Sequence, residues 1–147
     1  MILQLPVAKL TGKLSSLKAM ALGLSICIVS MLIMGNFPTM TGVIVAIMTF
    51  ALGEMTFQPR FLEYVASIAP KDKIGLYLGF AHIKVAVGSF LGGWIAGILV
   101  SKYCPVEGPR NPLMLWGSFA LIGLVSLIAF FIYQKTFGNL HDNGVSE

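Results

Sequence analysis

Charged side chains are scarce in this sequence. They make up 11% of the 147 residues, whereas a typical soluble domain carries about a quarter. Two stretches, 19–53 and 111–134, contain no charged residue at all, and each is longer than the roughly 20 apolar residues that cross a hydrocarbon core. Hydrophobic residues make up 56% of the chain. The composition excludes an ordinary soluble domain and indicates an integral membrane protein.

Other absences narrow the class further. The two cysteines, Cys27 and Cys104, give neither a disulfide framework nor the spacing of metal ligands. There is no HExxH motif, no suggestive pair of nucleophile and base, and no glycine-rich phosphate loop after a strand. We therefore expect no enzyme, no metal and no cofactor. The polar and apolar alternation of a membrane β-barrel is also missing, so the spans should be helices, which satisfy their own backbone groups in lipid.

The sequence predicts an all-α membrane protein with about four transmembrane helices. Turn-forming residues at 35–38, a polar turn at 69–73 and a Pro-rich connection at 104–112 separate the apolar segments. The expected helices are 15–35, 39–68, 74–103 and 113–137. Residues 1–14 are expected to be a cytoplasmic segment or the end of a preceding helix, and residues 138–147 a polar cytoplasmic tail.

The basic residues indicate how the helices are oriented. Lys102 and Arg110 fall on one side of the predicted membrane, and the other side carries Lys9, Lys13, Lys18, Lys71, Lys73 and Lys135. Because cytoplasmic loops are enriched in Lys and Arg, both termini are predicted to be cytoplasmic, in a bacterial inner membrane. The net charge of +4 therefore reflects topology and a lipid bilayer as partner, not nucleic acid.

Glu54 is the main candidate for function. It lies about fifteen residues, or roughly 22 Å, inside the second predicted helix, near the middle of the bilayer. Ionisable groups at that depth usually face a bundle interior or an aqueous cavity, and often mark proton relays or substrate sites. Burial favours a protonated carboxyl and a nearby cation favours the carboxylate, so Glu54 is suited to proton coupling or substrate binding. The alternative is a structural polar contact with another helix. Pro59 predicts a kink in the same helix.

A second group of polar residues lies nearer the predicted cytoplasmic surface. Arg60 and Glu63 are spaced to pair on one helical face, and His82 and Lys84 of the next helix should lie at a similar depth. These four residues are expected to form an ion-pair layer, either as a cytoplasmic gate or as a static, partly hydrated contact.

The third predicted helix carries two ridges of small residues. Gly88 and Gly92 lie on one ridge, and Gly93 and Gly97 on the next. Small residues allow helices to approach closely. The pattern predicts close helix packing but does not say which helix is the neighbour.

Several of these elements together resemble a known family. They are Gly53-Glu54, Pro59, Ala69-Pro70 with Lys71 and Lys73, and Leu78-Gly79-Phe80 before the glycine-rich segment. They resemble the tenth and eleventh helices of major facilitator superfamily transporters and, more narrowly, of the proton-dependent oligopeptide transporter family. The resemblance implies that these are the last four helices of a twelve-helix fold, and that Glu54 faces the central cavity and engages the amino group of the substrate.

Two functions remain open at this point. The first is the C-terminal part of a proton-coupled secondary transporter that moves a small solute, such as a short peptide, by alternating access. Its partners would be protons, the solute and the remaining transporter helices, because alternating access needs one bundle to rock against another. The alternative is a small four-helix membrane scaffold or assembly protein, or an inactive transporter fragment, with no transport of its own.

Overall fold

The computed structural model describes residues 15–138, and this part of the chain contains helices and connecting turns but no strand. The helices are α2 (Ser16–Asn36), α3 (Met40–Ile68), α4 (Ile74–Ala81), α5 (Ile83–Tyr103) and α6 (Pro112–Tyr133), followed by the π-helical turn η1 (Gln134–Gly138). The expected N-terminal segment 1–14 and the tail from residue 139 lie outside the described residues.

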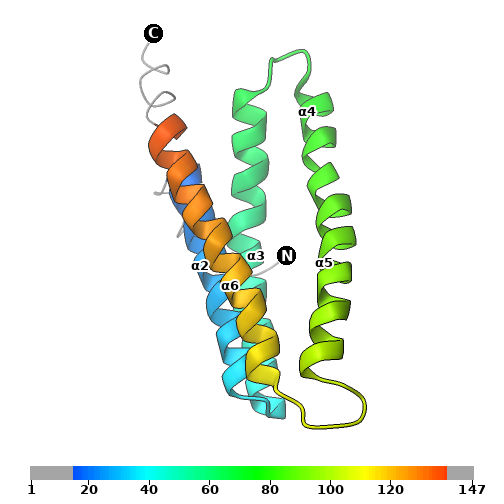
Figure 1. Ribbon diagram of the computed structural model, residues 1–147. Coiled ribbons are helices and arrows are strands. Elements are labelled where there is room, and N and C mark those ends of the chain that lie inside the picture. The colour runs from blue at the N-terminus through cyan, green and yellow to red at the C-terminus, as the bar shows by residue number, and fades with distance from the viewer. Residues whose placement is uncertain (1–14, 139–147) are drawn as a thin grey trace.

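Four helical spans are long and apolar enough to cross a membrane. They are Ser16–Asn36, Met40–Ile68, Ile74–Tyr103 and Pro112–Thr136. The prediction of an all-α membrane protein with four transmembrane helices is therefore confirmed. The α3–α4 turn and the end of α6 lie at one end of the molecule, and the α2–α3 turn and the α5–α6 loop lie at the other (Figure 1).

Side-chain caps begin two of the spans. The Thr39 hydroxyl accepts a hydrogen bond from the Gly42 N–H at 3.2 Å, before α3. The Asn111 side-chain oxygen accepts one from the Met114 N–H at 3.1 Å, and Pro112 occupies the first turn of α6. Each cap satisfies a backbone donor that has no partner within the helix, so the turn residues seen in the sequence start these helices directly.

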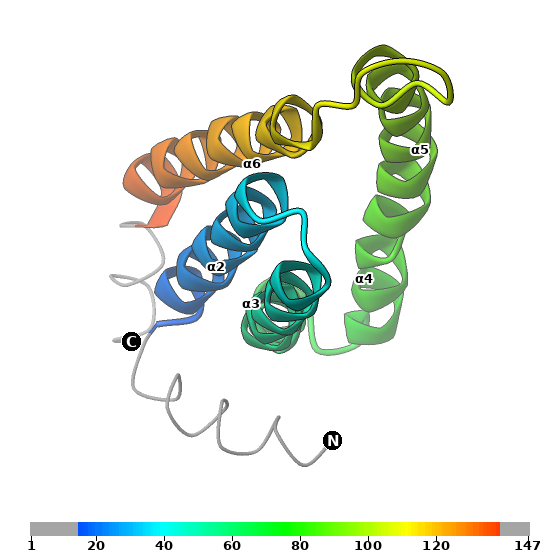
Figure 2. The same ribbon diagram turned by 90° about the horizontal axis from the view of Figure 1, so that it is seen from below.

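Helices α2, α3 and α6 pack together through small residues (Figure 2). A Cβ atom added to Gly53 of α3 would lie 2.8 Å from the Gly23 carbonyl oxygen of α2. On the other side of α2, a Cβ added to Gly123 of α6 would lie 2.9 Å from Ile28 Cγ1. Without a hydrophobic driving force in lipid, such close approach lets van der Waals contact hold helices together. The α2–α3 crossing fixes the position of Gly53, and so of its neighbour Glu54.

Helices α4 and α5 stand apart from this group of three (Figure 2), and they contain no buried residue. The close packing predicted for Gly88, Gly92, Gly93 and Gly97 is not found within residues 15–138. A Cβ added at any of the four would meet nothing within 4 Å. Among the described residues, the glycines in close contact with another helix are instead those at the α2–α3 and α2–α6 crossings.

The third predicted span is divided at His82, which the sequence analysis did not anticipate. The His82 Nδ1 atom lies 2.8 Å from the Leu78 carbonyl oxygen, the acceptor that a regular helix would give to the His82 N–H. That N–H instead bonds the Gly79 carbonyl oxygen at 3.1 Å. The ring therefore competes with the backbone for one acceptor and tightens the turn between α4 and α5.

Pro59 lies inside α3, which continues as one helix from Met40 to Ile68. Proline has no N–H, so the Met55 carbonyl loses its usual helical donor at this point. The kink expected at Pro59 remains a prediction. Within the third predicted span, by contrast, the helix is interrupted at His82.

Candidate functional site

Glu54 is the middle residue of α3, with fourteen residues of the 29-residue helix on either side. Its side chain is exposed in this chain and borders two hollows. One is a cavity of about 250 Å³ between α2, α3 and α6, lined by Leu24, Cys27, Ile28, Met31, Phe50, Glu54, Phe57, Phe119 and Gly123. The other, of about 340 Å³, runs along α3 past Gln58, Pro59 and Leu62. The carboxyl group therefore sits at mid-helix beside open space.

Lys84 reaches from α5 across to α3. Its ammonium nitrogen lies 3.4 Å from the centre of the Phe61 ring and 5.3 Å from the centre of the Phe57 ring. It also lies 3.5 Å from the Gln58 side-chain oxygen. All three contacted residues belong to α3, so the lysine bridges two helices that otherwise make little contact.

Glu54, Phe57, Gln58 and Phe61 share one face of α3. Phe57, Gln58 and Phe61 follow Glu54 by three, four and seven residues, which places all four along one side of a helix. Lys84 reaches this face from α5, and Cys27 of α2 lines the same cavity as Glu54. The charged site of the described chain is therefore one carboxylate and one ammonium group on facing helices, with two aromatic rings and an amide between them.

The four residues expected to form one ion-pair layer have different surroundings. Arg60 Nη1 lies 2.7 Å from Glu63 Oε2, within a single helix. His82 uses its ring nitrogen on the Leu78 carbonyl of its own helix. Lys84 reaches the face of α3 that carries Glu54. Within residues 15–138 the only ion pair among these four is therefore Arg60–Glu63, and Lys84 contacts Phe61, the residue after Arg60; the common layer remains a prediction.

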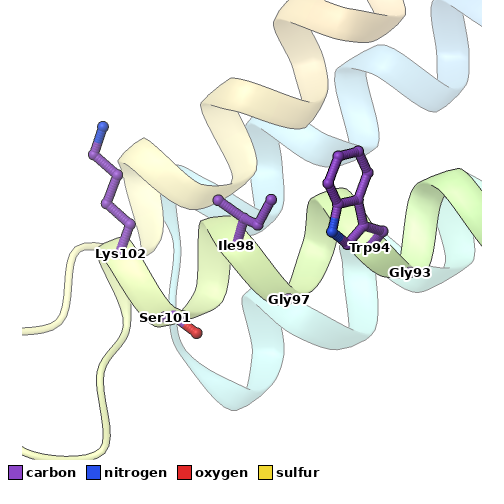
Figure 3. A pocket seen from close by; sticks show the side chains of 6 residues that line it. All are labelled: Gly93, Trp94, Gly97, Ile98, Ser101 and Lys102. Atoms are coloured by element: carbon purple, nitrogen blue, oxygen red, sulfur yellow. The ribbon is translucent and has the colours of Figure 1, made fainter.

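A broad hollow follows the glycine side of α5. It is about 640 Å³, and its lining consists of Gly93, Trp94, Gly97, Ile98, Ser101 and Lys102, all from that one helix (Figure 3). The Trp94 side chain is 66% exposed, so nothing in the described chain covers this face. The hollow arises from missing side chains at the glycines and does not bring reactive groups together.

Sequence reasoning missed several residues of the site. Phe57, Gln58 and Phe61 were not singled out, although their spacing from Glu54 was visible as a helical face. A hydrogen bond of 2.8 Å between the Tyr64 and Tyr133 hydroxyls joins α3 to α6, and no local pattern indicates it. Among residues 15–138, no group of three or more His, Cys, Asp or Glu side chains is placed to hold a metal ion.

Comparison with known proteins gives a consistent result. The sequence profile of the Major Facilitator Superfamily matches residues 1–147. The uncharacterized MFS-type transporter YttB of Bacillus subtilis is 30% identical over 121 residues, which cover 82% of this chain and 29% of YttB. No solved structure matches the chain.

Multidrug resistance proteins named MdtH are also similar. The protein from Citrobacter koseri is 26% identical over 132 residues, covering 89% of this chain and 33% of the relative. The protein from Proteus mirabilis is 29% identical over 113 residues, which cover 77% of this chain and 28% of the relative. The chain thus spans about a third or less of the length of these relatives. With a family match along its whole length, the chain belongs to the major facilitator superfamily.

Proposed function

We propose that this chain forms the C-terminal part of a proton-coupled secondary transporter, with Glu54 as the carboxylate that binds the proton or the substrate. The observation that carries the proposal is the position of Glu54 at the middle of a spanning helix, exposed and beside open space. A carboxylate at that depth is stable only if water, a cation or a polar partner reaches it. A transport path supplies all three.

Lys84 from α5 reaches the face of α3 that carries Glu54, and Cys27 from α2 lines the same cavity as Glu54. The wall contributed by α6, Phe119 and Gly123, carries no charge. When Glu54 is ionised, Lys84 balances it; when Glu54 takes up a proton, that attraction is lost. Proton binding would thereby change how strongly α5 is held to α3, which links protonation to helix position.

The remaining helices of the transporter are proposed to cover the open side of α5. Its glycines leave a surface where another helix can approach closely. Alternating access also needs a second bundle to move against this one. The same open face is compatible with the alternative function, a four-helix scaffold that assembles with other membrane proteins. The absence of any substrate flux from the complete protein would favour that alternative.

The solute is proposed to be a small organic compound that carries an amino group. The resemblance of the Glu54 segment suggests a short peptide, whereas the names of several relatives refer to multidrug resistance. Both kinds of compound can present a cationic nitrogen to a carboxylate. Arg60 and Glu63 are proposed to stabilise the cytoplasmic end of α3 as an ion pair, in a bacterial inner membrane with both termini in the cytoplasm.

The test is flux driven by a pH gradient in proteoliposomes that contain the complete protein. The Glu54→Gln variant keeps the size of the side chain but cannot ionise, so we expect the gradient to stop driving transport. Glu107→Gln is the matched control, because Glu107 lies in the α5–α6 loop outside the spans. Gradient-driven flux that is the same in Glu54→Gln and in the unmodified protein would refute the coupling role.

A further inference from the structure

The face of α3 next to Glu54 has the chemistry of an ammonium-binding site. The Phe57 and Phe61 rings are nearly parallel, at 8°, with their centres 6.0 Å apart. The face of an aromatic ring attracts a cation within about 6 Å of its centre, and Lys84 Nζ lies within that range of both rings. Gln58 adds an amide oxygen as hydrogen-bond acceptor. One turn away, the Glu54 carboxylate supplies negative charge.

The contact made by Lys84 is suited to being displaced. The Lys84 side chain is exposed, and its distance of 3.5 Å to the Gln58 oxygen is longer than that of a strong hydrogen bond. Helix packing does not force the contact, because α5 has no buried residue. The ammonium group is therefore held by the chemistry of the α3 face rather than by the fold around it.

We propose that Phe57, Gln58 and Phe61 form a binding subsite for the ammonium group of the transported solute, and that Lys84 occupies it as an internal competitor. This inference rests on the proposed transport role of Glu54, because it names the chemical class of solute for the same site. The solute class is an organic cation, either a primary amine or a quaternary ammonium compound. A solute that enters the subsite releases Lys84 from α3.

The two kinds of cation should use the subsite differently. A quaternary ammonium group has no N–H, so it interacts with the rings and the carboxylate but cannot donate to Gln58. A primary ammonium group can interact with the rings and the carboxylate and can also donate a hydrogen bond to Gln58. Loss of the Gln58 acceptor should therefore weaken the binding of a primary amine more than that of a quaternary compound.

The experiment measures binding of benzyltrimethylammonium to the complete protein in lipid nanodiscs by isothermal titration calorimetry. Lys84→Met should tighten binding roughly three- to tenfold, because the competitor is removed. Lys102→Met is the matched control, since Lys102 also lies 5.3 Å from an aromatic ring, that of Tyr103, but at the other end of α5. This control should leave the affinity unchanged. Lys84→Arg, which keeps the cation, should stay near the unmodified affinity.

The Phe61→Leu substitution distinguishes binding to the aromatic rings from a simple effect of charge. Without Lys84, the negative charge of Glu54 is unbalanced and attracts any cation more strongly. A gain in affinity alone therefore does not show that the aromatic rings bind the ligand. In the Lys84→Met background, Phe61→Leu should reverse the gain about three- to tenfold. An unchanged affinity in Lys84→Met, or a gain that survives Phe61→Leu, would overturn the proposal. Circular dichroism of each variant establishes that it is folded.

Failure of this inference and failure of the proposed function give different results. The binding measurement needs no proton gradient, whereas the flux measurement compares Glu54→Gln with the unmodified protein and leaves Lys84 in place. If Glu54→Gln abolishes gradient-driven flux while Lys84→Met leaves binding unchanged, the function stands and the subsite is wrong. If the variants change binding as expected but flux ignores the pH gradient, the subsite stands and proton coupling is wrong.

Discussion

Replacing Gly53 by alanine should force α2 and α3 apart. The added Cβ would lie 2.5 Å from Cys27 Sγ, 2.8 Å from the Gly23 carbonyl oxygen and 3.0 Å from the Cys27 backbone nitrogen, whereas ordinary contact begins at 3.4 Å. The sulfur can rotate away, but the two backbone atoms move only with their helix. The helix pair must therefore open by about 0.6 Å at this point.

The energetic cost follows from that displacement. A radial gap of about 0.5–1 Å already forfeits a quarter to a half of the dispersion attraction between two surfaces. Overpacking of this kind costs about 1–3 kcal/mol, and the better helix propensity of alanine returns up to about 1 kcal/mol. We expect Gly53→Ala to lower the free energy of unfolding by about 0–2 kcal/mol, which is about 1–3 kcal/mol relative to an alanine substitution that gains the propensity without the clash.

The assay is unfolding of the complete protein in dodecylmaltoside micelles by added SDS, followed by far-UV circular dichroism. Gly117→Ala in α6 is the matched control, because a Cβ there would meet nothing within 4 Å. The control should be neutral or slightly stabilising. Equal stability of the Gly53→Ala and Gly117→Ala variants would refute the account of the α2–α3 crossing.

Three further contacts are tested by substitution in the same assay. Tyr64→Phe and Tyr133→Phe should be non-additive, with a coupling energy of about 0.5–1.5 kcal/mol, because their hydroxyls bond one another; additive effects would contradict this. Asn111→Ala should cost about 1 kcal/mol by removing the cap of α6, whereas Asn111→Asp, which keeps an acceptor, should not. Glu63→Gln should change stability by no more than about 1 kcal/mol, because the Glu63 side chain is 56% exposed; a larger loss would show that its pair with Arg60 is shielded from solvent.

The order of the spans could be predicted because it depends on local composition. Uncharged runs, the turn at residues 35–38 and the basic turn at residues 69–73 separate the helices, and the structure places helix ends beside both turns. The position of Glu54 at the middle of α3 followed from counting residues along the predicted helix. These features need no knowledge of which helices touch.

The features that could not be predicted depend on contacts between distant segments. The α5 glycines form a ridge pattern and Gly53 of α3 does not, yet the close approach to another helix is found at Gly53 and not at the α5 glycines. Lys84 contacts Gln58, which precedes it by 26 residues. The hydropathy pattern does not predict a contact between side chains so far apart in the sequence. The break at His82 depends on the orientation of one ring toward one carbonyl oxygen.

The site also shows why α5 could not be placed from its own sequence. Its apolar side chains, among them Phe90 and Trp94, are exposed on the described chain. A helix that is hydrophobic on all sides gives no sign of which face is buried. In the described chain α5 is connected to its neighbours by the turn at residues 69–73, by contacts with α6 and by the contact that Lys84 makes with α3.

The central claim, that Glu54 lines a water-accessible path, is tested most directly by thiol labelling at position 54. Cys27→Ser and Cys104→Ser remove the free thiols of the described residues, and Glu54→Cys then places one thiol on the path. Leu121→Cys, on the exposed side of α6, is the control for a position that faces lipid. We predict that a charged, membrane-impermeant methanethiosulfonate modifies the protein at position 54 but not at position 121. Modification at position 54 by a lipid-soluble maleimide alone would contradict the account.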